Sequence, residues 1–168
     1  HSTLILDSSS SCKFKRDIDG ILKVNKELKV FKKPIIKEKN YWCIEGSHEG
    51  YLKQYGIIHE RKIEYLIDKD KLLGTDKLLK RKKLKSTNFE IRFHFEPGVK
   101  ITKTQDKKFI LIELKNSGWK FLCNGYTIEV ETGLYFGKKN SFVENQNIFI
   151  SGITQNNDQE INWELSKI

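Results

Sequence analysis

The chain has 168 residues, 38% of them hydrophobic, which is the size of one ordinary domain with a substantial core. Its 31 Lys and Arg exceed its 22 Asp and Glu and give a net charge of +9. This charge favours a polyanionic partner such as nucleic acid, acidic polysaccharide or a membrane surface. No apolar run approaches the ~18 residues that a membrane-spanning helix requires, so we expect no membrane span.

The first residues place His1, Ser2 and Thr3 directly before the apolar run 4–6, which we interpret as a strand. Met is absent from the whole chain, and no signal sequence precedes this strand. We therefore expect a piece cut from a longer protein, or one processed at its N-terminus.

Alternating apolar and polar residues, the pattern of half-buried strands, dominate the chain. In residues 89–95 the apolar side chains share one face, whereas Glu90, Arg92 and His94 share the other. Short aromatic and β-branched runs, separated by turn residues, predict further strands at 108–114, 118–123, 126–131, 133–137, 147–151 and 160–166.

Residues 68–85 are the one candidate for a helix of normal length, but Gly74 interrupts them. We interpret them as two short strands, or as a strand and a turn, before a basic connector. The predicted fold class is all-β, with about a dozen short strands in an antiparallel two-sheet β-sandwich of the supersandwich kind. Because no linker or repeat divides the chain, residues 1–168 are expected to form a single domain.

The three cysteines, Cys12, Cys43 and Cys123, are widely spaced, odd in number and without a CxxC pattern. They support neither a disulfide framework nor a cysteine zinc site. We expect buried free thiols, and cysteine usage leaves the compartment open.

His59 and Arg61 interrupt an apolar stripe that Ile57, Ile63 and Tyr65 form on one face of a predicted strand. A buried Arg without a partner is costly, so Arg61 is expected to meet a carboxylate. The pair is interpreted either as a structural ion pair or as a site at the end of the sandwich, where His59 binds a metal or a substrate acid. The candidate carboxylates are Asp7, Asp17, Asp19 and Asp68.

Three further polar features each have a structural and a functional interpretation. His48 lies in a loop between two glycines, as polar surface or as a ligand-binding group. His94 is interpreted as a surface or second-face histidine of its strand. The basic run at 77–85 is a solvated face or a polyanion contact, and no aromatic residues interleave with it as single-strand stacking would require.

Several stretches, taken in order, resemble the C-terminal β-domain of the heparinase II/III-like polysaccharide lyases. That domain opens with His, Asn or Ser, Thr and an apolar strand ending near Asp, and residues 1–7 match it. Its HxGY segment and HxR strand are matched by residues 48–63, and its short element with Gly and Asp by residues 73–78. Its later strands are matched by residues 92–99, 116–121, 135–137 and 163–165.

The resemblance implies a parent enzyme that cleaves uronic-acid-containing polysaccharide by β-elimination. Such a lyase pairs a helical toroid domain, which supplies a Tyr and an Asn or His, with this β-sandwich. The family's His that opens the β-domain completes the site, and this catalytic role carries over to His1. His48 and Arg61 fit the family pattern and are carried over as substrate-binding residues. Since the helical half is missing from these residues, we expect the chain alone to be inactive.

The resemblance also implies the partners and the compartment. The expected partners are an acidic polysaccharide, a glycosaminoglycan or alginate, and the helical toroid domain of the same parent chain. No cofactor is required, but some members hold a structural zinc, for which His59 is the best match with Asp17 or Asp19 as a second ligand. The family's location implies the periplasm or the cell envelope.

Two other functions stay open at this point. A non-catalytic carbohydrate-binding or interaction sandwich would bind acidic glycans through a lysine-lined groove with Trp42 or Trp119 exposed. A nucleic-acid binder is disfavoured, because Lys greatly outnumbers Arg and basic residues do not alternate with aromatic ones.

Overall fold

The computed structural model describes residues 2–25, 28–105, 108–138 and 141–168. Within these residues the chain is nearly all-β, with a four-residue helix α1 (Leu52–Tyr55) and a 3-10 turn at Ile67–Lys69. The strands of the first half are β1 (Leu4–Leu6), β2 (Phe14–Arg16), β3 (Leu22–Val24), β4 (Val30–Lys32), β5 (Ile36–Lys37), β6 (Tyr41–His48), β7 (Ile57–Leu66) and β8 (Lys71–Lys80). Those of the second half are β9 (Asn88–His94), β10 (Lys100–Lys103), β11 (Ile110–Leu114), β12 (Ser117–Cys123), β13 (Thr127–Lys138), β14 (Ser141–Ile153) and β15 (Gln159–Lys167).

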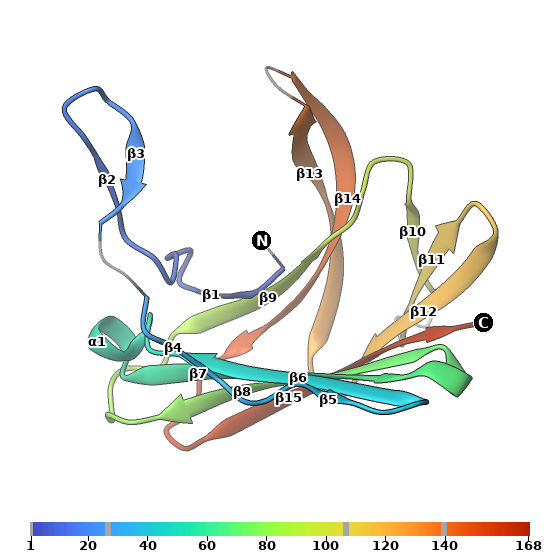
Figure 1. Ribbon diagram of the computed structural model, residues 1–168, viewed down its shortest axis with the longest axis horizontal. Helices are drawn as coiled ribbons and strands as arrows, with labels where there is room; N and C mark the ends of the chain where they lie inside the picture. The colour runs from blue at the N-terminus through green and yellow to red at the C-terminus, as the bar shows by residue number, and fades with distance from the viewer. Residues whose placement is uncertain (1, 26–27, 106–107, 139–140) are drawn as a thin grey trace.

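Antiparallel pairing joins most of these strands into two sheets that lie face to face (Figure 1). The small sheet has the order β1-β9-β14-β13, and the large sheet has the order β10-β11-β12-β15-β8-β7-β6-β4, with β5 also paired to β6. The predicted all-β antiparallel sandwich is confirmed. Several strands are longer than the short strands expected, and β14 extends over 13 residues.

The inner faces of the two sheets form one hydrophobic core. Phe89 and Ile91 of β9 are fully buried, and Phe93 packs against the core, as the alternation at 89–95 predicts. The centroid of the Phe93 ring lies 4.9 Å from that of Phe121 in β12 and 4.8 Å from that of Trp163 in β15. Edge-to-face aromatic contacts of this kind add to the energy of simple burial, so they attach the small sheet firmly to the large one.

Gly74 does not end a strand, contrary to the expectation that residues 68–85 contain two short strands or a strand and a turn. β8 runs through it without interruption from Lys71 to Lys80. A Cβ atom at this position would lie 2.0 Å from the ring of Trp163, its register partner in β15. The glycine is therefore needed so that the indole can lie flat across the neighbouring strand.

The outer face of the large sheet is polar and rich in ion pairs. Lys71 pairs with Glu164 at 2.8 Å, and Lys77 pairs with Glu160 at 3.3 Å, each between the neighbouring strands β8 and β15. Exposed pairs like these contribute little to stability, but they keep this face in water. On this face, acidic residues of the neighbouring strand thus balance the charges of Lys71 and Lys77.

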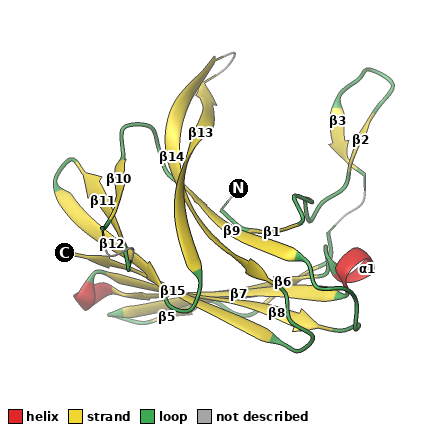
Figure 2. Cartoon of the chain, turned by 180° about the vertical axis from the view of Figure 1, so that it is seen from behind, coloured by secondary structure: helices red, strands yellow, loops and turns green. Residues whose placement is uncertain are grey.

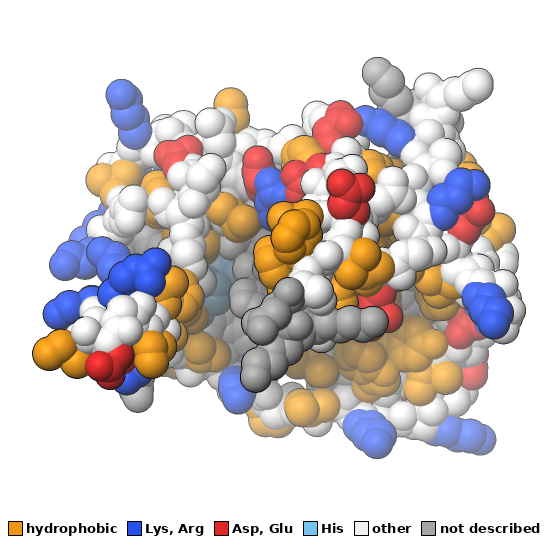
Figure 3. Space-filling view, turned by 90° about the horizontal axis from the view of Figure 1, so that it is seen from above, with side chains coloured by type: hydrophobic (Ala, Val, Ile, Leu, Met, Phe, Trp, Pro, Cys, Tyr) orange, Lys and Arg blue, Asp and Glu red, His pale blue; other side chains and the backbone are white. Residues whose placement is uncertain are grey.

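Two hairpins project from the same side of the sandwich, formed by β2 with β3 and by the distal halves of β13 and β14 (Figures 1 and 2). Seen from above, the β2–β3 hairpin carries both hydrophobic and Lys or Arg side chains on its surface (left of Figure 3). Between the two hairpins β1 crosses the molecule (Figure 1). The described helices are all too short to cross a membrane.

Candidate functional site

A buried carboxylate, that of Asp76 in β8, forms the centre of a polar network in the core. Its side chain is 0% exposed. Its Oδ1 accepts hydrogen bonds from His59 Nε2 at 2.6 Å and from Arg61 Nε at 2.7 Å. Its Oδ2 accepts from Trp163 Nε1 at 2.8 Å and from a terminal nitrogen of Arg61 at 3.1 Å. Donors from β7 and β15, the two strands beside β8, therefore satisfy both oxygens.

The two histidines continue this network in a fixed order of donors and acceptors. The backbone N–H of Gly50 donates to His48 Nδ1 at 3.3 Å, so the proton of His48 lies on Nε2. That Nε2–H donates to His59 Nδ1 at 3.2 Å, and His59 in turn donates from Nε2 to Asp76. Both rings are thus held in the Nε2-protonated tautomer.

Protonation states follow from burial and from neighbouring charges. Burial alone would raise the pKa of Asp76, but the hydrogen bond from His59 and the charge of Arg61 outweigh it and hold the pKa below its ordinary value. Burial, with the electrostatic effect of the neighbouring His59 and Arg61, lowers the pKa of His48 from 6.5 to about 4. At neutral pH the network contains an ionised Asp76, paired with Arg61, and a neutral His48.

Arg61 links this network to the residue next to His1. One terminal nitrogen of Arg61 donates to the carbonyl oxygen of Ser2 at 2.6 Å. The hydroxyl of Ser2 accepts from the backbone N–H of His94 at 3.0 Å, on the small sheet. Ser2 is therefore held by groups from both sheets. His1, for which we predict a catalytic role, lies outside the described residues.

Two tyrosines hold the strand that follows. Tyr51, which precedes α1, donates from its hydroxyl to the carbonyl oxygen of Leu4 at 2.8 Å. Tyr55, at the end of α1, donates to the carbonyl oxygen of Leu6 at 3.3 Å. Each tyrosine therefore secures the free edge of β1.

A second polar group lies on the outer face of the small sheet, next to Ser2. His94 shares a hydrogen bond of 3.1 Å with Asn147, whose Oδ1 also accepts from Asn145 at 3.0 Å. Burial lowers the pKa of His94, which favours its neutral form. The predicted second-face position of His94 is confirmed, and its partners, Asn145 and Asn147, were not identified from the sequence. The spacing of the two asparagines, two residues apart and therefore on one face of a strand, is the sequence signal that could have identified them.

The expected zinc ligands do not come together. Both ring nitrogens of His59 are occupied by His48 and Asp76.

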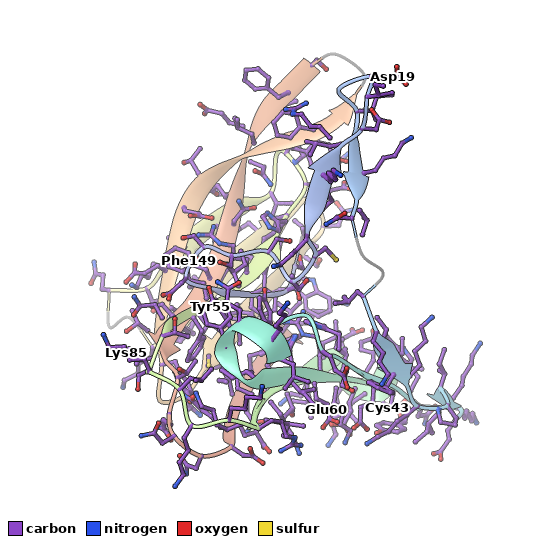
Figure 4. The ribbon with its side chains drawn as sticks, turned by 90° about the vertical axis from the view of Figure 1, so that its left-hand side faces the viewer. Asp19, Cys43, Tyr55, Glu60, Lys85 and Phe149 are labelled. Carbon is purple, nitrogen blue, oxygen red and sulfur yellow. The ribbon has the colours of Figure 1, made fainter. Side chains whose placement is uncertain are left out.

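Asp17 and Asp19 lie in the turn of the β2–β3 hairpin, where Asp17 accepts from backbone N–H groups and pairs with Lys23. Figure 4 shows Asp19 at the tip of this hairpin, far from Glu60, the neighbour of His59. These residues do not fit a zinc ion, and no cluster of three metal-ligating side chains occurs in the described part of the chain.

The expected carboxylate partner of Arg61 was wrongly identified. Arg61 does meet a carboxylate, as its buried position requires, but this is Asp76 and none of the candidates Asp7, Asp17, Asp19 and Asp68. Of the two interpretations, the structural ion pair is the one that these contacts support. The substrate-binding role expected for His48 finds no support in its contacts either, since both of its ring nitrogens are engaged within the protein.

The remaining sequence-based expectations concern the surface and the thiols. Trp42 lies against Tyr65 with ring centroids 5.7 Å apart, Trp119 packs against the core, and both are half-buried. In the basic run at 77–85, Lys77 and Arg81 pair with acidic residues of the chain. All three cysteines are free, with Cys43 and Cys123 buried as expected and Cys12 half-buried.

Comparison with solved structures shows that the sandwich occurs in polysaccharide lyases. The heparan sulfate lyase HepC from Pedobacter heparinus matches 99% of this chain with a TM-score of 0.75 and 12% identity. The heparinase III product of gene BT4657 matches 100% of it with a TM-score of 0.71 and 13% identity. The matched regions are 24% of each of those chains, so this chain spans about a quarter of their length.

Residues 1–164 match the family model described as heparinase II/III-like, C-terminal. The chain therefore belongs to this family, and the resemblance inferred from the ordered motifs is confirmed. No curated protein sequence matches it.

Replacing Asp76 with Asn should destabilise the domain strongly. The amide nitrogen of Asn would face the Trp163 and Arg61 donors, and the Arg61 charge would lose its counterion. Breaking a buried ion pair in this way costs about 3–5 kcal/mol. Urea unfolding of the variant measures the loss. The control is Asp70→Asn, which removes an exposed partner of Lys167 and should cost at most about 1 kcal/mol. Equal losses in the two variants would contradict the central role of Asp76.

Acidification should weaken the fold through His48. Because its pKa falls from 6.5 to about 4 on folding, the unfolded chain takes up a proton first as the pH drops. The contribution of neutral His48 to the free energy of unfolding is fully present above pH 6.5. It is lost as the pH falls from 6.5 towards about 4. Urea unfolding across this range should show a steeper pH dependence for the wild type than for His48→Gln. Identical slopes would show that His48 is not buried as described.

Proposed function

We propose that the chain is the C-terminal β-sandwich of a heparinase-type lyase that cleaves uronic-acid-containing polysaccharide by β-elimination. The match of the family model to residues 1–164 is the observation that carries this proposal. The agreement in fold with a heparan sulfate lyase and a heparinase III supports it. The net charge of +9 suits an acidic polymer.

β-Elimination requires three kinds of group in such a site: a base, an acid and a group that stabilises negative charge. A base removes the proton on carbon 5, which lies α to the uronate carboxylate, and an acid assists the departure of the glycosidic oxygen from carbon 4. The developing enolate charge must also be stabilised by positive groups or hydrogen-bond donors. In this proposal His1 is one of the groups that move a proton, and its partners belong to the helical part of the parent chain.

Arg61 contributes to this proposal by positioning. Its guanidinium holds the carbonyl oxygen of Ser2 while Asp76 fixes the guanidinium from behind. An atom displaced by about 1 Å can cost a catalytic step ~100-fold in rate, so rigid support of the segment next to His1 matters for turnover. Arg61 therefore positions the segment next to His1 through Ser2. Its contacts to Ser2 and Asp76 support this role.

The substrate and the setting follow as proposals too. The names of the two similar structures make heparan-sulfate-type chains the first polymers to test, with alginate as a further uronate polymer. The helical toroid domain of the parent chain is the proposed partner, and the 168 residues alone are proposed to be inactive. Secretion to the periplasm or cell envelope, as in the family, is also proposed.

The test is a lyase assay on the full-length parent protein. Each elimination leaves an unsaturated uronate, so ultraviolet absorbance should rise with time on at least one of several uronate polymers. Replacing His1 with Ala should lower kcat by about 10²–10⁴-fold, the usual contribution of a general acid or base. Lys77→Gln, on the outer face of the large sheet, is the control and should keep wild-type activity.

The outcomes separate the alternatives. No rise in absorbance with any polymer, together with salt-sensitive glycan binding, would replace the lyase with a non-catalytic carbohydrate-binding sandwich. An active parent whose His1→Ala variant keeps full activity would contradict the role of His1 and leave the lyase assignment intact.

A further inference from the structure

We propose that the β2–β3 hairpin is a docking arm, and that its apolar side packs against the part of the heparinase polypeptide outside this domain. The proposal depends on this chain being one domain of a longer heparinase, and it does not depend on the lyase chemistry. The term docking arm refers here to residues 13–25.

The docking arm has two unlike sides. The register pairs Phe14 with Val24 and Lys15 with Lys23. Residues that face each other across antiparallel strands lie on the same side, so Phe14 and Val24 share one side and the two lysines share the other. By the same rule Leu22 and its register partner Arg16 lie on the side of Phe14 and Val24, and the Arg16 guanidinium donates to the carbonyl oxygen of Gly20 at the turn.

The apolar side is exposed in this domain. Phe14, Leu22 and Val24 are 54–57% exposed, and Ile18 at the turn is 101% exposed. Among the described strands, β2 and β3 pair with each other and belong to neither the small sheet nor the large sheet. An isolated two-stranded hairpin is at best marginally stable in water, so this arm requires a surface to pack against.

The chemistry of the apolar side favours a protein surface over a polysaccharide. Two of its large side chains, Leu22 and Val24, are aliphatic, as is Ile18 at the turn. Such side chains have no ring face for stacking on a sugar and no hydrogen-bond donor for its hydroxyls. On the opposite side Lys23 forms an ion pair of 2.8 Å with Asp17, which suits a face that stays in water. A strip of three exposed apolar side chains with one Arg is typical of the core of a protein interface, where aromatic residues and Arg are enriched.

The position of the docking arm indicates which protein surface this is. In the two similar heparinase structures the matched region is 24% of the chain, so most of each polypeptide lies outside this domain. The arm rises on the side of the sandwich where β1 and the anchored Ser2 lie (Figure 1). A second hairpin, β13–β14, rises on that side and also exposes an aromatic pair, Phe136 and Phe142, whose ring centroids are 6.0 Å apart. Hairpins with exposed apolar residues therefore lie on either side of β1.

Limited trypsin digestion of the full-length heparinase tests this. The docking arm contains the cleavage sites Lys13, Lys15, Arg16 and Lys23, and the exposed segment at 81–86 supplies reference sites in the same chain. In the wild type, cleavage in the arm should be about tenfold slower than at the reference sites, because trypsin can cleave the arm only after it detaches from the surface on which it is docked. Ile18→Gln should raise cleavage in the arm about tenfold, since burial of one Ile is worth at least that factor.

The matched control is Ile168→Gln, which changes another exposed isoleucine and should leave cleavage in the arm unchanged. Wild-type cleavage in the arm at the reference rate would overturn the proposal. Protection that appears only on adding heparan sulfate would make the arm a ligand surface, and protection that grows with protein concentration would make it a contact between copies. Lyase activity is measured on the same preparations: activity with an unprotected arm overturns docking alone, and a protected arm without activity overturns the lyase alone.

Discussion

The ionised carboxylate of Asp76 in a hydrophobic core is the constraint on which the rest of this structure depends. A buried charge is tolerated only with a close counterion and full hydrogen bonding, and Arg61, His59 and Trp163 supply both. These donors come from β7 and β15, on either side of β8. A slip of β8 by one residue would turn Asp76 to the outer face and leave Arg61 without its counterion, so the polar network fixes the register of three strands.

The same network connects the large sheet to the start of the chain. Arg61 extends from Asp76 to the carbonyl oxygen of Ser2, and Tyr51 holds the carbonyl oxygen of Leu4 two residues later. The edge strand β1 is therefore secured through its backbone by Tyr51 next to α1, and the residue Ser2 before it by Arg61 of the opposite sheet. A segment held in this way is suited to present a neighbouring side chain to a partner domain in a defined position, which is what the proposed role of His1 requires.

The sequence predicted correctly which face of a strand is buried. It did not predict contacts that depend on which strands pair and in which register. The alternation at 89–95 and at 57–63 identified the inner faces correctly, because half-buried strands must alternate. The partner of Arg61 was missed because Asp76 lies opposite it in the next strand, and that register cannot be read from one sequence. Gly74 was wrongly predicted to interrupt a strand. The position requires glycine because of the Trp163 ring, which is 89 residues away in the chain. The ordered motifs, by contrast, identified the family.

The most direct test of this account is the steady-state kinetics of Arg61→Gln in the full-length parent protein, assayed as the proposed lyase. If Arg61 acts by holding Ser2, the variant should lose about 100-fold in kcat while KM stays within a few-fold of the wild type. Urea unfolding confirms that the variant is folded under the assay conditions. A rise in KM with unchanged kcat would contradict the account, because it would show that Arg61 binds the substrate and does not position the segment next to His1.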